Sequence, residues 1–389
     1  MPMASWTERE LDELEREGLL RAEASVQGCS GPYFSLDGRA VLSFSSNNYL
    51  GLADDARLVT ALCEAAGRLG VGAGASRLVA GSNDEHRACE LELAAFVNRP
   101  DAILFSSGYA ANVGVLSSLG REGDLIYSDE LNHASIIDGC RLSRATVRVF
   151  PHRDLDALRT LLLQDSHADQ RRLIVTDALF SMEGHLAPLA ELRALADELD
   201  AALIVDEAHS LGVLGPQGRG ACAACGISPD LLIGTLGKAF GVSGSFVATD
   251  TASTQLLKNR ARSYVFSTAP PPALAAAIRA SLSLVRGADD RRATLKRHVD
   301  RLRAGLLALG FDLPPTDGAI LPILIGDPAK TMRASARLLD DGVYARGIRP
   351  PTVAVGTSRI RLVPMSTHTD QDIDTVLNAF TRLRQSEAA

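Results

Sequence analysis

One lysine and one aspartate in this chain could together hold pyridoxal phosphate (PLP). Lys238 lies in a glycine-rich stretch, residues 234–241, and Asp206 follows an apolar run a few dozen residues earlier. The aldehyde of PLP needs an amine to hold it as a Schiff base. Its ring nitrogen needs a nearby carboxylate to stay protonated and draw electrons. We therefore interpret Lys238 as the Schiff-base lysine and Asp206 as the partner of the ring nitrogen.

Each of these residues also has an ordinary structural interpretation. Most lysines are solvated on the surface, and residues 206–209 could simply cap and begin a helix. A bound PLP requires a neutral amine, so the PLP hypothesis predicts that cationic and desolvated surroundings lower the pKa of Lys238. Thr235 offers a hydroxyl for the cofactor phosphate, and His209 could hydrogen-bond the ring hydroxyl or orient the imine.

Three further segments contain candidate contacts. Residues 106–112 form a small-residue turn between an expected strand and an expected helix, where free backbone N–H groups suit a phosphate. His133 could stack on the pyridine ring, although an isolated histidine is more often structural. Arg359 and Arg361 alternate as in a strand, so they share one face and could bind a carboxylate. A surface salt bridge explains these two arginines equally well.

Three other patterns do not support the chemistry that they first suggest. Residues 70–76 are glycine-rich, but they follow a helical stretch and lack the third glycine of an NAD site. Cys222 and Cys225 have no second half of a zinc set, so we expect packing residues and no metal. Residues 206–209 read Asp-Glu-Ala-His like a helicase box, but no phosphate-binding loop precedes them, and Ala239 stands where a magnesium-binding hydroxyl should be.

Short apolar runs alternate with longer helical patterns through the middle of the chain. This alternation is typical of an α/β fold with a mostly parallel sheet between helices. Ligands bind beyond the carboxyl ends of such strands, and Asp177, Asp206 and residues 106–108 and 234–235 directly follow runs. We therefore expect one site at that rim. The runs are residues 102–105, 125–127, 147–150, 173–175, 203–205, 231–233 and 246–248.

We divide the chain into three parts. Residues 1–45 are an N-terminal helical segment, whose first twenty residues should form an amphipathic helix that packs on the body. Residues 46–285 are the large PLP-binding α/β domain. Residues 286–389 are a smaller C-terminal α+β domain, which follows the three prolines at 270–272 and a long helical stretch.

Composition excludes several functional classes. The chain has 389 residues, 46% of them hydrophobic, so it can bury a large core. A net charge of -7 argues against a nucleic-acid partner. We find neither a secretion signal nor an apolar run of roughly 20 residues that could span a membrane. We therefore expect a cytoplasmic protein whose six cysteines are reduced.

The order and spacing of the motifs resemble those of the α-oxoamine synthases, PLP-dependent enzymes of fold type I. The resemblance covers nearly the whole chain, and it implies a homodimer with active sites at the subunit interface. Tyr109 replaces a phenylalanine of some relatives, but the phosphate contact there is made by the backbone. The matching segments are residues 44–52, 72–81, 106–112, 180–184, 206–209, 234–241 and 349–353.

The resemblance implies roles for individual positions. Lys238, Asp206, His133 and His209 match catalytic positions, and either Ser267 or Thr268 should reach the phosphate of the partner subunit. Asn47 and Arg361 match the pair that holds the amino acid carboxylate. The implied cofactor contacts are Gly108, Tyr109, His133, Ser181, Asp206, His209, Thr235, Lys238 and Thr268. The implied substrate contacts are Arg21, Asn47, His133, Thr352 and Arg361.

Members of this family condense an amino acid with an acyl thioester and release carbon dioxide. Residues 349–353 resemble the member that uses L-alanine and a pimeloyl thioester, carried by CoA or by acyl-carrier protein, in biotin biosynthesis. The alternatives are glycine-using members, such as 2-amino-3-ketobutyrate CoA ligase (glycine C-acetyltransferase) and 5-aminolevulinate synthase. A non-catalytic binding protein on the same fold is disfavoured because the lysine, the aspartate and both carboxylate-binding candidates are present.

Overall fold

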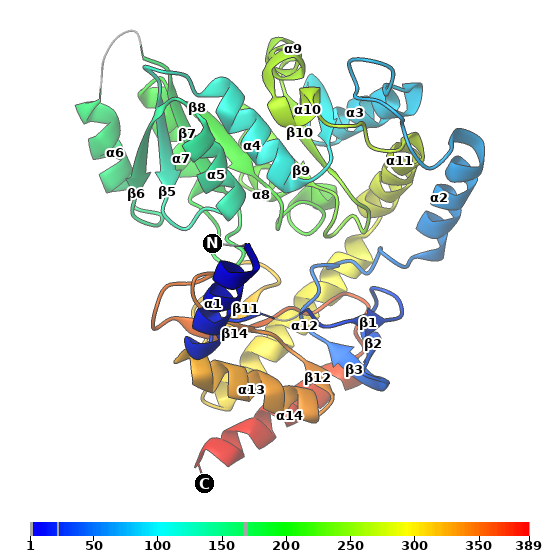
Figure 1. Ribbon diagram of the computed structural model, residues 1–389, viewed down its shortest axis with the longest axis vertical. Helices are drawn as coiled ribbons and strands as arrows, with labels where there is room; N and C mark the ends of the chain where they lie inside the picture. Colours follow the sequence, from blue (N-terminus) through cyan, green and yellow to red (C-terminus); the bar gives the residue numbers. More distant parts are fainter. Residues whose placement is uncertain (1–2, 22, 166–169, 389) are drawn as a thin grey trace.

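The computed structural model of this chain describes residues 3–21, 23–165 and 170–388. A seven-stranded sheet forms the centre of the upper lobe in Figure 1, in the order β4-β10-β9-β8-β7-β5-β6. All seven apolar runs expected from the sequence are strands of this sheet. They are β4 (Asp101–Phe105), β5 (Leu125–Asp129), β6 (Thr146–Phe150), β7 (Arg172–Asp177), β8 (Ala202–Asp206), β9 (Leu231–Thr235) and β10 (Ser245–Thr249).

The sheet is mostly parallel, as expected. β5 pairs parallel with β6 and β7, and β8 pairs parallel with β7 and β9. β10 runs antiparallel to both of its neighbours, β4 and β9. Every residue of β4, β5 and β10 is buried, which explains why these strands are continuous apolar runs rather than alternating ones.

Helices cover both faces of the sheet because alternate strand residues point to opposite sides. Ile103 and Phe105 of β4 share a core with the helices of one face, and Leu104 shares a core with helices of the other. The first face carries α4 (Gly108–Leu119), α5 (Ala134–Leu142), α9 (Thr251–Arg260) and α10 (Arg262–Val265). The other carries α3 (Asp84–Phe96), α6 (Leu155–Gln164), α7 (Leu189–Glu198), α8 (Ala221–Ala224) and α11 (Pro272–Arg286), and α2 (Ala56–Leu69) packs on α11.

The smaller lobe follows α12 (Asp289–Ala308), which leads from the upper to the lower part of Figure 1. Its three-stranded sheet has the order β11-β14-β13 and packs against α13 and α14. The elements are β11 (Leu321–Gly326), α13 (Pro328–Asp340), β12 (Val343–Tyr344), β13 (Gly347–Ile348), β14 (Ser358–Leu362) and α14 (Asp370–Ala388).

The N-terminal segment contributes strands to the smaller lobe. β1 (Val26–Gln27), β2 (Tyr33–Leu36) and β3 (Arg39–Ser43) form a second sheet with β12, so residues 26–43 are not helical. Only α1 (Met3–Arg16) is a helix in the described part of residues 1–45. The division of the chain at residues 45 and 285 remains a prediction.

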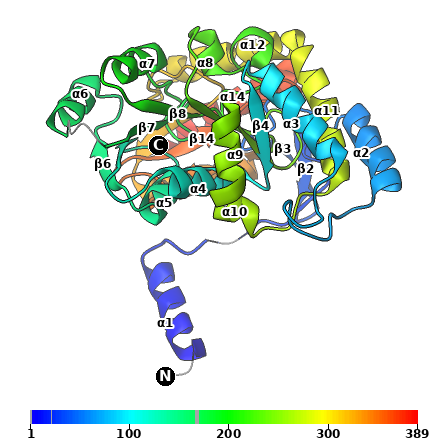
Figure 2. The same cartoon turned by 90° about the horizontal axis from the view of Figure 1, so that it is seen from above.

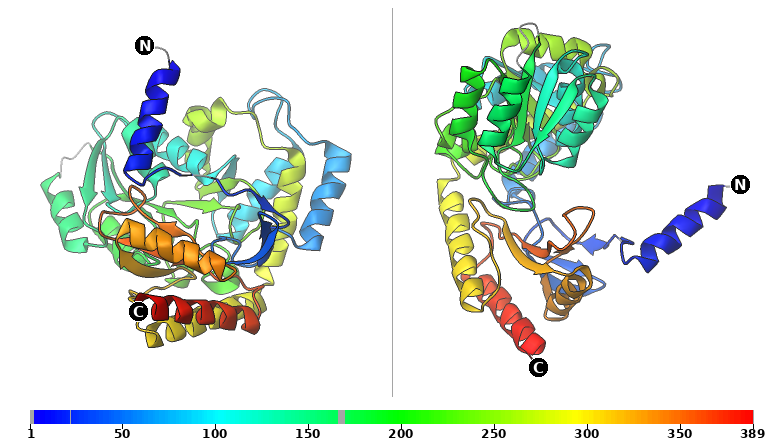
Figure 3. Two further views of the ribbon diagram at one scale, coloured as in Figure 1. Left: turned by 60° about the horizontal axis from the view of Figure 1, so that its bottom comes forward. Right: turned by 90° about the vertical axis from the view of Figure 1, so that its left-hand side faces the viewer.

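The expected packing of the N-terminal helix on the body is wrong. α1 has no buried residue, and Figure 2 and the right-hand view of Figure 3 show it pointing away from both lobes. Trp6, Leu11 and Leu14 are 41%, 51% and 39% exposed. Amphipathic periodicity shows that a helix has an apolar face, but it does not identify the surface that covers that face.

The cysteines of this chain form no disulfide, and all six are free. Cys222 packs in the core beside the sheet, as expected, but Cys225 is exposed, so the packing interpretation of that residue is wrong. Among the described residues, no cluster of three or more His, Cys, Asp or Glu side chains could hold a metal ion. None of the described helices combines the length and apolar character needed to cross a membrane.

Candidate active site

The carboxyl ends of β7, β8 and β9 bring the predicted residues to one rim. Asp177 and Asp206 end β7 and β8 and pair with each other in register, and Thr235 ends β9. Gly108 begins α4 so close to Thr235 that a Cβ at Gly108 would lie 3.8 Å from the threonine Oγ1. The convergence of these segments, predicted from their positions after strand runs, is confirmed.

Asp206 is held by two hydrogen-bond donors. Its Oδ2 accepts from Nδ2 of Asn112 at 2.6 Å, and its Oδ1 accepts from the backbone N–H of Ala208 at 2.9 Å. The side chain is buried. An ionised carboxylate can accept about four hydrogen bonds, so Asp206 retains acceptor capacity for a protonated ring nitrogen in a place of low dielectric.

Lys238 is partly buried, and its amine is desolvated rather than fully hydrated. Its Nζ lies 2.8 Å from Nε2 of His209. Burial lowers the pKa of Lys238 to about 8, and Arg361 acts in the same direction, whereas Asp206 and Asp177 oppose the shift. The direction agrees with the expectation from sequence, and burial rather than cationic neighbours is the main cause.

A chain of hydrogen bonds leads from Lys238 to Asn47. Burial holds the pKa of His209 well below its usual value, and the charge of Lys238 adds to this effect. The ring is therefore neutral: Nε2 accepts from Lys238, so Nδ1 donates to the hydroxyl of Tyr49 at 2.6 Å. The Tyr49 hydroxyl in turn donates to Oδ1 of Asn47 at 3.4 Å.

Arg361 and Asn47 meet as the resemblance implies. Nη2 of Arg361 donates to Oδ1 of Asn47 at 3.0 Å, and its Nε donates to the carbonyl oxygen of Ser181 at 2.6 Å. Arg359 points to the same loop, but it forms an ion pair with Glu183 at 3.1 Å. Arg359 therefore forms a salt bridge, but a buried one rather than the surface salt bridge considered from the sequence, whereas Arg361 has no carboxylate partner among the described residues.

His133 begins α5 beside the two aspartates. Its backbone N–H donates to Oδ2 of Asp177 at 2.7 Å, and its Nδ1 accepts from the backbone N–H of Ser135 at 3.2 Å. Desolvation lowers the pKa of His133; Asp206 opposes this shift and Lys238 reinforces it. The hydrogen bond to Asp177 holds the backbone of His133 in place, and so it helps to position the ring.

The segment after β4 has the geometry of a phosphate-binding turn. Ser107 is the N-cap of α4, and its Oγ accepts from the backbone N–H of Ala110 at 3.1 Å. The first N–H groups of a helix have no intrahelical partner, so those of Gly108 and Tyr109 can bind an anion next to Thr235. The Tyr109 side chain turns outward and donates to Asp138 at 2.6 Å. A backbone contact at Tyr109, as expected from the sequence, is compatible with this orientation.

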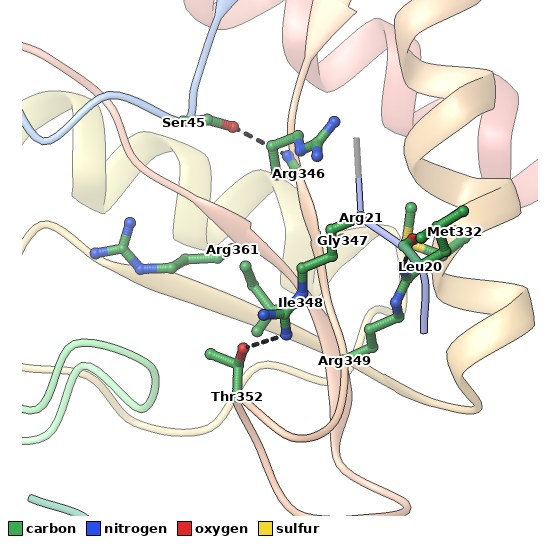
Figure 4. A pocket seen from close by; sticks show the side chains of 10 residues that line it. All are labelled: Leu20, Arg21, Ser45, Met332, Arg346, Gly347, Ile348, Arg349, Thr352 and Arg361. Carbon is green, nitrogen blue, oxygen red and sulfur yellow. Dashed lines mark hydrogen bonds between the residues drawn. The ribbon is translucent and has the colours of Figure 1, made fainter. Parts of the chain in front are cut away.

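The acyl-site candidates line a cavity of about 520 Å³ that also reaches Arg361. Figure 4 shows its side chains, with a hydrogen bond from Nη2 of Arg21 to Oγ1 of Thr352 at 2.9 Å. Arg349 donates to the carbonyl oxygen of Leu20 at 2.7 Å. The cavity is therefore lined by Arg361, by the chain after α1 and by the loop after β13.

Thr268 lies apart from this cluster. It forms an isolated bridge with Ser76 and is exposed in the single chain. A small pocket contains Thr268, Ser267, Arg77 and Ser106. Its assignment to the phosphate of a partner subunit stays a prediction.

Four buried residues of the site were given no role from the sequence: Tyr49, Asn112, Ser135 and Asp177. Tyr49 and Asn112 lie inside matching motif segments, and Ser135 follows His133 by two positions, so the signal was present in their neighbourhood. Glu207 has a separate structural role, since it is buried and accepts from the backbone N–H groups of Ala221 and Cys222 at 2.8 and 2.7 Å.

The residues present fit PLP. A buried carboxylate with spare acceptor capacity, a desolvated amine and a helix start whose N–H groups at Gly108 and Tyr109 are free for an anion lie on one rim, and Gly108 leaves space next to Thr235. Lys238 would hold the cofactor covalently, Asp206 would pair with its ring nitrogen, and the start of α4 with Thr235 would bind its phosphate.

Comparisons with known proteins agree with this geometry. Residues 39–380 match the family described as aminotransferase class I and II. An 8-amino-7-oxononanoate synthase of Marinobacter nauticus is 46% identical over 379 residues, which cover 97% of this chain and 95% of the relative. The solved structure of 8-amino-7-oxononanoate synthase from Francisella tularensis has a TM-score of 0.77 and 31% identity, over 90% of this chain and 99% of that one. A serine palmitoyltransferase from S. paucimobilis, solved with bound PLP, has a TM-score of 0.93 and 30% identity over the whole of both chains.

The pKa of Lys238 predicts how the cofactor-free protein takes up PLP. Only the neutral amine attacks the aldehyde, so the rate should rise about tenfold per pH unit at low pH and level off near pH 8. Arg361→Ala removes a charge that lowers this pKa, so its plateau should lie at higher pH. Stopped-flow absorption of the growing PLP–protein band measures both profiles.

The matched control is Arg359→Ala, because Arg359 is ion-paired with Glu183 and is not among the groups that shift Lys238. Its profile should follow that of the unmodified protein. A rate that keeps rising to about pH 10, the range of a solvated lysine, contradicts the assignment of a desolvated amine.

Proposed function

The chain belongs to the class I and II aminotransferase family, in the group of its 8-amino-7-oxononanoate synthases, and we propose that it condenses L-alanine with a pimeloyl thioester. The products are 8-amino-7-oxononanoate, carbon dioxide and the free thiol carrier. The enzyme is a PLP-dependent C-acyltransferase of biotin biosynthesis. The acyl carrier is CoA or acyl-carrier protein.

One observation supports a reaction between an amino acid and an acyl substrate. Arg361 lies both at the Lys238 rim, where it contacts Asn47, and on the wall of the cavity that holds Arg21 and Thr352. An amino acid whose carboxylate binds Arg361 would therefore have its α-carbon toward Lys238 and an acyl chain beside it in the cavity. Two substrates that must form a carbon–carbon bond need this proximity.

Lys238 would act as the general base of the reaction. PLP, when bound, draws electrons from the α-carbon of alanine through its protonated ring nitrogen. The amine of Lys238, freed when alanine binds, would remove the α-proton, and a pKa of about 8 places this base near neutral pH. Asp206 would keep the ring nitrogen protonated throughout.

The chain from Lys238 through His209 and Tyr49 to Asn47 would orient both ends of the amino acid site. Neutral His209 accepts from the Lys238 amine, which directs that amine toward one face of the cofactor. Tyr49 donates to the same oxygen of Asn47 that accepts from Arg361. Burial raises the pKa of Tyr49 to about 12, so the hydroxyl keeps its proton and remains a donor.

We also propose a homodimer. The bridge between Ser76 and Thr268 lies close in sequence to Val71, Val79 and Phe266, which are 84%, 81% and 72% exposed. Large apolar side chains with such exposure indicate a surface that another protein covers. A second subunit there would bring Thr268 near its partner's site, and sedimentation should give twice the chain mass of 41.2 kDa.

Substrate preference tests the proposed function directly. Purified, PLP-loaded protein is titrated with L-alanine, glycine and L-serine, and each amino acid is then combined in turn with pimeloyl-CoA, acetyl-CoA and palmitoyl-CoA. Mass spectrometry should find 8-amino-7-oxononanoate formed efficiently with alanine and pimeloyl-CoA. A preference for glycine with acetyl-CoA would assign glycine C-acetyltransferase activity instead, and a preference for serine with palmitoyl-CoA would assign the activity named for the similar serine palmitoyltransferase structure.

Arg361→Ala should weaken alanine binding by on the order of 10- to 100-fold, because a hydrogen bond to a charged group contributes about 1.5 to 3 kcal/mol. The spectral change of bound PLP during an alanine titration gives the dissociation constant. Arg346→Ala is the control, since Arg346 lines the same cavity but packs over the ring of Tyr344. Equal alanine affinity in both variants would remove Arg361 from the carboxylate site.

A further inference from the structure

Asn112 joins the aspartate of the site to the helix that carries His133. It lies on α4 and is 1% exposed. Its Nδ2 donates to Oδ2 of Asp206 at 2.6 Å and to Oγ of Ser135 at 2.9 Å. A carboxylate only accepts hydrogen bonds, so the amide atom that faces Asp206 must be the nitrogen, and both amide hydrogens are used.

The direction of these hydrogen bonds determines where His133 carries its proton. Ser135 Oγ accepts from Asn112 and lies 2.7 Å from Nδ1 of His133, and the backbone N–H of Ser135 also donates to that Nδ1. The backbone N–H of Ser135 points at Nδ1, and a second N–H at Nδ1 would face it, so Nδ1 carries no hydrogen. The Ser135 hydroxyl therefore donates its own hydrogen to Nδ1. The proton of neutral His133 therefore lies on Nε2.

We propose that Asn112 and Ser135 are positioning residues that fix His133 as the neutral tautomer with its proton on Nε2. The chain from Asp206 through Asn112 and Ser135 to His133 is called the amide relay. Through it, His133 presents a hydrogen-bond donor to the site and cannot act as a base at Nδ1. The use of this donor on a substrate carboxylate or acyl oxygen rests on the proposed function; the tautomer does not.

Folding alone does not explain an asparagine at this position. Oδ1 of Asn112 is buried and has no hydrogen-bond partner among the described residues. An unpaired buried acceptor is unfavourable, and an apolar side chain of similar size would avoid it. Compared with an apolar side chain, the Asn112 amide adds two donated hydrogen bonds, one to Asp206 and one to Ser135. Asp206 raises the pKa of His133 and Lys238 lowers it, so these two charges oppose each other. The hydrogen bonds of the amide relay then determine which ring nitrogen carries the proton.

Removal of the Ser135 hydroxyl tests the relay. Ser135→Ala deletes the donor that stabilises the neutral ring, so the pKa of His133 should rise, with an about three- to tenfold change in its proton dissociation constant. Nitrogen NMR of the full-length, histidine-labelled protein, with and without PLP, measures this equilibrium and shows which ring nitrogen is protonated. His133→Gln identifies its signal among those of the eight histidines.

Conservative and matched variants separate the relay from a general effect on folding. Ser135→Thr keeps the hydroxyl and should retain the original titration. Ser143→Ala makes the same change at the other end of α5, where Ser143 binds the carbonyl oxygen of Cys140, and should leave His133 unchanged. Asn112→Leu should raise the PLP dissociation constant about tenfold, because Asp206 loses a charge-assisted hydrogen bond.

The comparison of Ser135→Ala with Ser135→Thr decides the outcome even if the Asn112→Leu variant does not fold. A His133 tautomer and titration that are the same in Ser135→Ala and Ser135→Thr would overturn the proposal. These measurements need neither alanine nor an acyl thioester. Failure of the relay and failure of the proposed reaction are therefore separate results.

Discussion

The lowered pKa of the Lys238 amine is the constraint on which the site depends. Desolvation of the amine lowers its pKa, and this effect outweighs the attraction of Asp206 and Asp177 for a proton on the amine. The fold must therefore place carboxylates close enough to serve the cofactor ring without ion pairing with the lysine. Strand ends provide this placement, because β7 and β8 present Asp177 and Asp206 side by side while Lys238 comes from the loop after β9.

Two hydrogen-bonded chains extend this constraint across the site. One runs from Lys238 through His209 and Tyr49 to Asn47, where Arg361 also donates. The other is the amide relay between Asp206 and His133. In each chain every buried donor faces an acceptor, so the direction of one hydrogen bond sets the direction of the next. The larger lobe thus fixes the amine and the aspartate, and the smaller lobe supplies Arg361 and much of the lining of the cavity beside it.

The sequence predicted what depends on local pattern. The seven apolar runs identified the strands, and the rule for open parallel sheets placed Asp206 and Thr235 at one rim. Tyr49, Asn112 and Ser135 were not assigned because hydrogen bonds between distant segments leave no periodic signal. The docking of α1 was wrong because an apolar helix face does not specify its partner. β1, β2 and β3 pair locally with one another and were missed, whereas the pairing of β3 with β12 joins residues about 300 positions apart, which no local pattern shows.

The central claim is that Lys238 holds the cofactor. The chain offers three other lysines, Lys258, Lys296 and Lys330, none of which lies at the rim. Reduction of the PLP-loaded protein with borohydride, followed by digestion and mass spectrometry, locates the modified lysine. We predict a pyridoxyl group on the peptide that contains Lys238. Modification of one of the other three lysines, with Lys238 unmodified, would contradict the account.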